Sequence, residues 1–116
     1  MIVGSIKENL TVEKRVSLTP ETVKNIIGLG LKVCIEKDYA SHLGVVDNNY
    51  KDAGAEIKSS SSEVLNLCNL LIKVNCPPEN EISQIKENTI LIGMLNPSKN
   101  KDQINEILKK NIKLFS

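Results

Sequence analysis

The sequence predicts an α/β domain in which an open, mostly parallel sheet carries helices on both faces. Short apolar runs alternate with segments of helical periodicity along the chain, and the connections between them are only a few residues long. Such alternation makes the strands parallel and joins them by right-handed crossover helices. The length of 116 residues, 41% of them hydrophobic, suits one domain with its own core. We therefore expect a single three-layer domain over residues 1–116, flavodoxin-like or Rossmann-like in class.

The first half of the chain contains the clearest helix start. Thr19 supplies a hydroxyl for the N-cap, Pro20 fits the first helical position, and Glu21 places an acid in the first turn. Apolar residues then recur at helical spacing until Gly30, which is a typical helix stop. A second helix is expected to begin with Asp47 as its N-cap. This half is expected to hold a strand over 2–6, a helix over 20–29, a strand over 32–36, a helix over 47–53 and a strand over 55–57.

The second half continues the alternation. The serines from Ser59 to Ser62 predict a helix start, because a serine hydroxyl can cap the first turn. Residues 89–95 (TILIGML) form the most apolar run, so we expect a central strand there, buried on both faces. The other expected elements are a helix that runs to Cys68, a strand over 70–74, a helix over 79–86, a helix over 101–110 and a strand over 112–115.

Composition excludes several classes of function. Fifteen basic residues against fourteen acidic ones leave a net charge of +1, without the basic excess of a nucleic-acid-binding surface. Aromatic residues make up 3%, too few for a platform on which bases stack. No apolar run approaches the ~20 residues that span a bilayer, and the first ten residues lack the features of a signal peptide. We expect a soluble chain that binds no nucleic acid.

The cysteines and the histidine do not form a recognisable metal or redox site. Cys34, Cys68 and Cys76 lack the paired spacing of a zinc site or of a C-x-x-C motif. We expect reduced thiols, with Cys34 in a strand and Cys68 in a helix as small core residues. His42 is the only histidine, and it falls in a loop with no evident catalytic partner.

Motifs for phosphate binding and nucleophilic catalysis are also absent. The dinucleotide fingerprint G-x-G-x-x-G does not occur, and Gly28 and Gly30 fall at a helix end rather than at a helix start. There is no Walker A sequence and no nucleophile elbow. From the residues alone we expect no catalytic residue, no cofactor-binding residue and no metal ligand on this chain.

Two cations are nevertheless candidates for a binding site. Arg15 is the only arginine, and a guanidinium grips a carboxylate through two parallel hydrogen bonds. Lys73 lies near the end of an expected apolar strand, where burial of an ammonium is costly without an anion. The alternatives are a plain surface role for Arg15 and an edge-strand role for Lys73. If both cations line one pocket, their charged ends should lie within roughly 5–8 Å of each other.

Several segments, in fixed order, resemble a known family. They are RVSLTPETVKNIIGLGLKVCIEK, which begins at Arg15, and then DNNYKDAGAEI, LIKVNCP and TILIGMLNPSKN. Over essentially the whole chain the sequence is similar to the N-terminal domain shared by alanine dehydrogenase and the alpha subunit of the proton-translocating NAD(P) transhydrogenase. One departure concerns residues 38–40, where Asp-Tyr-Ala stands in place of the family's usual Gly-Ala-Gly, which leaves that loop's backbone geometry open.

The segment after the 89–95 run separates the two branches of this family. The resemblance implies a histidine there in alanine dehydrogenases, acting as an acid and base. This chain has Asn96 followed by Pro-Ser-Lys-Asn, which is similar to the transhydrogenase version. An amide cannot exchange a proton at neutral pH as an imidazole can. Asn96 therefore favours transhydrogenase and joins Arg15 and Lys73 as a third candidate residue of an anion site or cleft.

The resemblance implies a function for a longer protein. In it, the NAD(H)-binding component passes hydride from NADH to NADP on another component, coupled to proton translocation through a membrane component. The chain is then an inactive first half of that component, binds no cofactor alone, and supplies one wall of a cleft. The expected partners are the rest of the alpha subunit, the membrane and NADP-binding components, and a second copy in a homodimer.

Two alternatives to the transhydrogenase interpretation stay open. One is the alanine dehydrogenase N-terminal domain, whose pocket holds pyruvate through Arg15 and Lys73. The other is a non-enzymatic module for oligomer contacts or anion binding. The expected location is the cytoplasmic face of a bacterial inner membrane, or the matrix face in mitochondria. The chain stops at Ser116, directly after an expected strand, where α/β chains usually continue into a functional loop, so we expect a longer protein.

Overall fold

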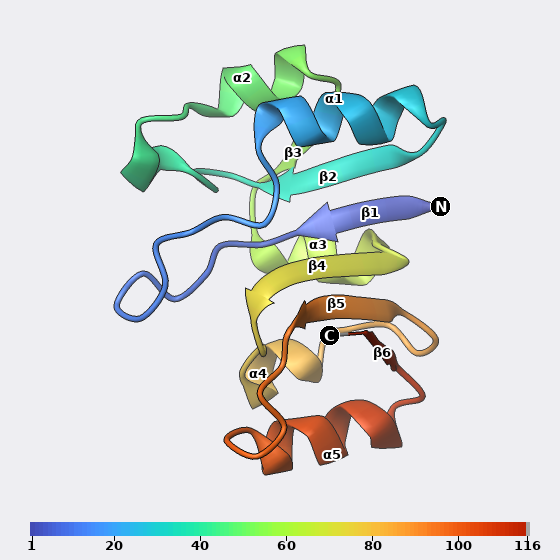
Figure 1. The fold of residues 1–116 in the computed structure, drawn as a ribbon. Helices are drawn as coiled ribbons and strands as arrows, with labels where there is room; N and C mark the ends of the chain where they lie inside the picture. The colour runs from blue at the N-terminus through green and yellow to red at the C-terminus, as the bar shows by residue number, and fades with distance from the viewer. Residues whose placement is uncertain (116) are drawn as a thin grey trace.

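The computed structural model describes residues 1–115 as an open, fully parallel sheet of six strands in the order β3-β2-β1-β4-β5-β6 (Figure 1). Ser116 lies outside the described residues. The strands are β1 (Ile2–Ser5), β2 (Lys32–Glu36), β3 (Glu56–Lys58), β4 (Leu70–Asn75), β5 (Ile90–Met94) and β6 (Lys113–Phe115). The helices are α1 (Pro20–Gly28), α2 (Asp47–Asp52), α3 (Ser61–Leu67), α4 (Glu79–Ile82) and α5 (Lys101–Lys109), with a 3-10 turn over Ser41–Leu43. The predicted fold class is confirmed, and the strand order is the Rossmann one.

The helices divide between the two faces of the sheet according to the direction in which the chain travels. From β1 to β3 the chain moves toward one edge, and α1 and α2 pack on one face. It then returns past β1 to β4 and continues to β6, and α3, α4 and α5 pack on the opposite face (Figure 1). Right-handed crossovers require this, since reversing the direction of travel reverses the face that the helix covers.

The predicted helix caps are mostly confirmed. The Thr19 hydroxyl accepts a hydrogen bond from the backbone N–H of Thr22 at 3.1 Å, and the Ser60 hydroxyl accepts one from Glu63 at 3.3 Å. Gly30 follows α1 with a φ of +89°, the left-handed conformation that ends many helices. The prediction for Asp47 was wrong, because Asp47 is the first residue of α2 rather than its N-cap. Its carboxylate instead accepts the backbone N–H of Asp38 at 3.0 Å.

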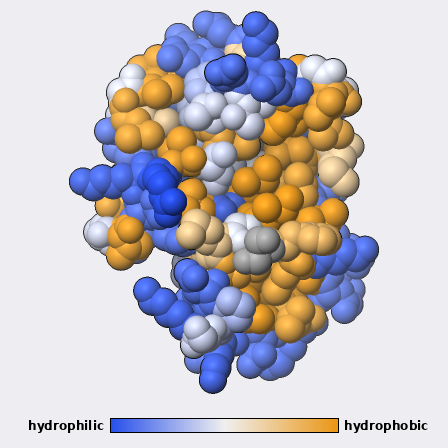
Figure 2. All heavy atoms as spheres, viewed as in Figure 1, coloured by the Kyte–Doolittle hydropathy of each residue, from blue (hydrophilic) through white to orange (hydrophobic). Residues whose placement is uncertain are grey.

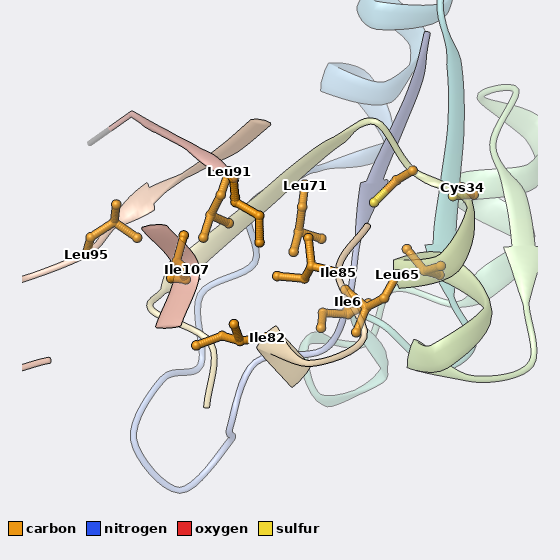
Figure 3. Packing of buried hydrophobic residues seen from close by; sticks show 12 residues of the cluster. Ile6, Cys34, Leu65, Leu71, Ile82, Ile85, Leu91, Leu95 and Ile107 are labelled. Atoms are coloured by element: carbon orange, nitrogen blue, oxygen red, sulfur yellow. The ribbon is translucent and has the colours of Figure 1, made fainter. Parts of the chain in front are cut away.

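Two apolar clusters form the core, one on each face of the sheet. The cluster beneath α3, α4 and α5 includes Cys34, Cys68 and Leu71, and Figure 3 shows how the leucines and isoleucines of this cluster converge. Cys34 and Cys68 are buried thiols, as predicted, but Cys68 follows the last residue of α3 instead of lying within the helix. Burial raises the pKa of Cys68 to about 12. The cluster beneath α1 and α2 is built around Tyr39 and Tyr50, whose rings meet edge to face with centroids 5.5 Å apart.

Two sequence predictions differ from the structure in the second half. The helix expected over 79–86 ends at Ile82, and turns occupy most of the next five residues. The run over 89–95 forms β5, but only one of its faces is buried, since Ile92 is 37% and Met94 51% exposed. The reason is topological, because all three crossovers from β3 to β6 cover the same face. In the register Ile72 lies opposite Ile92, and Ile92 opposite Phe115, so a hydrophobic surface remains over this side of the sheet (Figure 2).

None of the helices formed by residues 1–115 has the length and hydropathy of a membrane-spanning segment.

Candidate functional site

The candidate residues gather at the carboxyl ends of β1, β4 and β5. Strands β1 and β4 are neighbours, but the chain leaves them toward opposite edges of the sheet. In open α/β sheets, a crevice at such a switch point is where ligands bind. The loop over residues 6–19 follows β1, residues 76–78 follow β4, and residues 95–100 follow β5, so these three segments meet at that end (Figure 1).

Lys73, near the end of β4, is buried between two carboxylates. Its Nζ lies 3.3 Å from Oε1 of Glu8 and 3.6 Å from Oε1 of Glu81. The side chains of Lys73 and Glu8 are only 4% and 2% exposed. The edge-strand interpretation of Lys73 was therefore wrong, because β4 lies inside the sheet and the ammonium is held by acids instead of by solvent.

Glu8 also completes the hydrogen bonding at the end of β4. Its carboxylate accepts the backbone N–H of Val74 at 2.8 Å and that of Asn75 at 3.2 Å. The pairing of β4 with β5 is irregular between Ile72 and Asn75, and the carboxylate supplies acceptors at this point. Glu81 has no such support. Its buried Oε1 has no hydrogen-bond partner, and burial raises the pKa of this carboxyl, although the charge of Lys73 acts in the opposite direction.

Arg15 is held by an acid from its own loop. Oε2 of Glu13 accepts hydrogen bonds from Nε of Arg15 at 2.8 Å and from its backbone N at 2.9 Å, and Oε1 accepts from Nη2 at 2.8 Å. The Glu13 side chain is 9% exposed and that of Arg15 is 65% exposed. The hydrogen bonds from Arg15 lower the pKa of Glu13 from 4.5 to about 2.

Asn96 lies at the turn after β5 with a φ of +44°, in the left-handed region. Together with Arg15, Glu13 and Lys99 it lines a cavity of about 420 Å³. The side-chain amide of Asn100 donates to the carbonyls of Leu95 at 2.9 Å and Asn96 at 3.3 Å, which closes this turn before α5. Asparagine tolerates a positive φ better than most residues, so its presence here has a structural reason as well.

The three predicted residues thus occupy two adjoining cavities. Arg15 and Asn96 share one, whereas Lys73 lines a neighbouring cavity of about 390 Å³ with Lys7, Glu8 and Glu81. The two cavities have wall residues in common, namely Val12, Asn75 and Cys76. Arg15 and Lys73 also border a shallow groove over the uncovered sheet face. The separation of roughly 5–8 Å between the two charged ends stays a prediction.

Sequence reasoning missed the two glutamates that hold the cations. Glu8 and Glu13 both belong to the loop after β1, and each binds one candidate cation. One signal was available, because Glu13 precedes the only arginine by two residues. The loop is also fixed from outside, since Nε2 of His42 lies 2.7 Å from the carbonyl oxygen of Lys14. His42, expected in a loop with no catalytic partner, therefore makes a structural contact with the residue before Arg15.

The chemistry of the site is that of polar and ionic recognition. The cavity residues offer a guanidinium, ammonium groups, amides and carboxylates, and no imidazole is among them. In residues 1–115 no three His, Cys, Asp or Glu side chains are grouped closely enough to hold a metal ion. Cys76 lines both cavities, but burial raises its pKa, which disfavours the thiolate. The absence of a bound cofactor on this chain stays a prediction.

A sheet in this strand order, with a polar site at its switch point, defines an open α/β domain of the Rossmann class. The family model "Alanine dehydrogenase/PNT, N-terminal domain" matches residues 4–116, and the chain belongs to this family. The resemblance given by the sequence segments is confirmed.

Relatives from both branches align along the chain. The NAD(P) transhydrogenase subunit alpha of Haemophilus influenzae is 32% identical over 116 residues, which are all of this chain and 22% of that protein. The alanine dehydrogenase of Staphylococcus haemolyticus is 36% identical over 111 residues, covering 96% of this chain and 29% of that protein. The solved transhydrogenase of Sinorhizobium meliloti superposes with a TM-score of 0.93 at 26% identity, covering 100% of this chain and 34% of that one. The chain thus spans less than a third of these two sequence relatives.

Proposed function

We propose that the chain is the N-terminal part of the NAD(H)-binding component of a proton-translocating NAD(P) transhydrogenase. In the whole protein this component passes hydride from NADH to NADP bound elsewhere. The chain supplies one wall of the cleft that holds the nicotinamide end, and it is inactive alone. NAD and NADP serve the intact enzyme. The partners are the rest of the alpha subunit, the NADP-binding and membrane components, and a second copy of the NAD(H)-binding component.

The observation that carries this proposal is Asn96 in the cavity beside Arg15. Alanine deamination needs a group that takes up and releases a proton near the substrate, and a neutral amide cannot do this. Hydride transfer between two nicotinamides needs no such group, because the hydride passes directly from one ring to the other. Arg15 and Asn96 can then act as hydrogen-bond donors to polar groups of the nucleotide.

The ion pairs support the same proposal. A pocket for pyruvate needs cations with free charge, but Arg15 is paired with Glu13, and Lys73 is shared between Glu8 and Glu81. A nicotinamide carboxamide is neutral, so it can accept a hydrogen bond from a cation whose charge is already balanced. The site can therefore hold a polar neutral group, and it should bind a small free acid more weakly than a site with an unpaired cation would.

Alanine dehydrogenase is the second candidate, and two observations favour it. The identity to the alanine dehydrogenase of Staphylococcus haemolyticus is slightly higher than that to the transhydrogenase relative. Arg15 and Lys73 also line neighbouring cavities that have wall residues in common. A non-enzymatic anion-binding module is the third candidate, and it would use the same two cations without hydride transfer.

The test is an assay of the longer polypeptide that contains this chain, expressed with the proposed NADP-binding and membrane components and reconstituted in membrane vesicles. We expect reduction of an NADP analogue by NADH, together with a change in proton gradient, at the cytoplasmic face in bacteria or the matrix face in mitochondria. Oxidation of L-alanine with NAD, in the absence of transhydrogenation, would establish the second candidate instead. Absence of both reactions would favour the non-enzymatic module.

A further inference from the structure

The carboxylate of Glu13 binds both the backbone N–H and the guanidinium of Arg15. One oxygen accepts the backbone N–H and the Nε–H of Arg15, and the other accepts an N–H of Nη2. The guanidinium is therefore tied back to its own main chain through the acid. An exposed arginine without such a contact samples many rotamers, and fixing it in advance lowers the entropy lost when a ligand binds.

Glu13 itself is held in place by the loop. Its backbone N–H donates to the carbonyl of Asn9 at 2.9 Å, which closes a turn before Arg15. On the other side of Arg15, the hydroxyl oxygen of Tyr39 accepts the backbone N–H of Ser17 at 3.1 Å. The Tyr39 side chain is buried in the core, so the loop is anchored to a rigid part of the fold. The Glu13 side chain is also 9% exposed against 65% for that of Arg15, so the acid is the more confined member of the pair.

The arginine retains donors for a ligand. The bonds to Glu13 use Nε and one N–H of Nη2, and Nη1 has no acceptor among residues 1–115. Nη2 also lies 3.9 Å from the sulfur of Met94, which is a weak acceptor. The side chain borders the cavity that Asn96 and Lys99 line. A free guanidinium edge at a cavity suits a carboxylate or a carbonyl oxygen.

We propose that Glu13 is a positioning residue, which holds the Arg15 guanidinium so that its Nη1 edge is presented to an anionic or carbonyl oxygen in the cavity beside Asn96. This inference rests on Arg15 being a residue of the cleft, as in the proposed function. The proposal predicts that Glu13 strengthens the binding of an anion by Arg15, although the negative charge of Glu13 alone would weaken it. By charge alone, an acid beside a cation weakens the binding of an anion, so its removal should tighten binding. A positioning acid does the reverse, and its removal weakens binding.

The experiment uses the only arginine of the chain as its own probe. In the ¹⁵N-labelled chain the single Nε–H signal belongs to Arg15, and it is followed by NMR while malonate is added at constant ionic strength and pH 7. We expect a saturable shift in the wild type. In Glu13→Gln we expect weaker binding by roughly threefold to tenfold, together with faster exchange of the Nε–H with water. Glu21→Gln removes the same charge from an exposed helix position and serves as the matched control.

A second variant distinguishes the effect of the carboxylate's position from the effect of its charge. Glu13→Asp keeps the charge but shortens the side chain by one methylene, so it should also weaken binding, whereas an effect of charge alone would leave binding unchanged. Thermal unfolding of each variant shows that the fold is kept. Tighter or unchanged malonate binding in Glu13→Gln would overturn the proposal, and so would a wild-type signal that does not respond to malonate. The vesicle assay of transhydrogenation is independent of this titration, so the failure of one is distinct from the failure of the other.

Discussion

The carboxylate of Glu8 and the ammonium of Lys73 form an ion pair of 3.3 Å inside the carboxyl end of the sheet. Two acids, Glu8 and Glu81, lie beside this lysine. Glu8 makes the additional hydrogen bonds, because it also accepts two backbone N–H groups from the end of β4. Glu81 approaches the same ammonium to 3.6 Å, but its Oε1 lacks a hydrogen bond. The two acids lie beside the same ammonium but differ in their hydrogen bonds. We therefore expect Glu8 to contribute more than Glu81 to the free energy of unfolding.

Glu8→Ala is expected to lower the free energy of unfolding by about 3–5 kcal/mol, the usual cost of breaking a buried ion pair from one side. The variant leaves Lys73 with one weakly placed acid and leaves two backbone donors unpaired. Glu81→Gln is expected to change the same quantity by less than about 1 kcal/mol, because it removes a carboxylate whose ionisation burial already disfavours. Urea unfolding at pH 7 measures both.

The control for these two variants is Glu106→Gln. It breaks an exposed pair with Lys109 on α5, and such pairs contribute little. If Glu8→Ala and Glu81→Gln lowered the free energy of unfolding by similar amounts, the backbone hydrogen bonds of Glu8 would contribute no additional stability.

The pair of Glu13 and Arg15 should appear in the pH dependence of the protein. Because folding lowers the pKa of Glu13 from 4.5 to about 2, the folded state binds this proton more weakly than the unfolded chain does. The contribution of the pair to stability is therefore complete above about pH 4.5 and is lost as the pH falls toward 2. NMR titration of the Glu13 carboxyl should give a midpoint near the lower value.

Arg15→Gln should raise the pKa of Glu13 toward its ordinary range in that titration. The pKa of Glu56, which a hydrogen bond from Lys58 lowers, is the internal control and should not respond to this substitution. A midpoint for Glu13 that is the same with and without Arg15 would contradict the ion pair.

Gly4 in β1 lies directly against Val64 of α3 and against Cys68, which follows that helix. A Cβ added there would lie 2.7 Å from Cβ of Cys68 and 2.8 Å from Cγ1 of Val64. Gly4→Ala is therefore expected to lower the free energy of unfolding by about 1–3 kcal/mol through overpacking. Gly28→Ala, at a helical position with open space around it, should raise it by about 0.5 kcal/mol. Thermal and urea unfolding compare the two, and equal effects would show that helix and sheet can separate at Gly4 without cost.

The fold could be predicted from the sequence because its signals are local. The caps at Thr19 and Ser60 and the stop at Gly30 depend on neighbouring residues, and all three are observed. The burial of residues 89–95 could not be predicted in the same way. Apolar composition does not show on which face the crossover helices pack, and this depends on strand order. Ile92 and Met94 are exposed because no helix from residues 1–115 covers their side of β5.

The site was predictable only in part, because the acid that pairs with Lys73 is far from it in the sequence. Arg15 and Lys73 were identified because cations are unusual at their positions. The partner of Lys73, Glu8, lies sixty-five residues away in the chain and reaches it only because β1 and β4 are adjacent. The separation into two cavities depends on where Val12, Asn75 and Cys76 lie, which no local pattern specifies.

Asn96 provides the prediction that separates the two enzyme branches. Its φ of +44° is one that histidine also tolerates better than most residues, so Asn96→His should fold. In the longer polypeptide this variant gains an imidazole beside Arg15, but Arg15 stays paired with Glu13, and Lys73 stays enclosed by its two acids. We therefore expect no oxidation of L-alanine by NAD in either the wild type or Asn96→His, while transhydrogenation persists in the wild type. The measurement is NADH formation with L-alanine, with the alanine dehydrogenase of Staphylococcus haemolyticus as a positive control. Wild-type turnover on the order of 1 s⁻¹, an ordinary enzyme rate, would show that proton transfer at this site does not require a histidine and would favour alanine dehydrogenase.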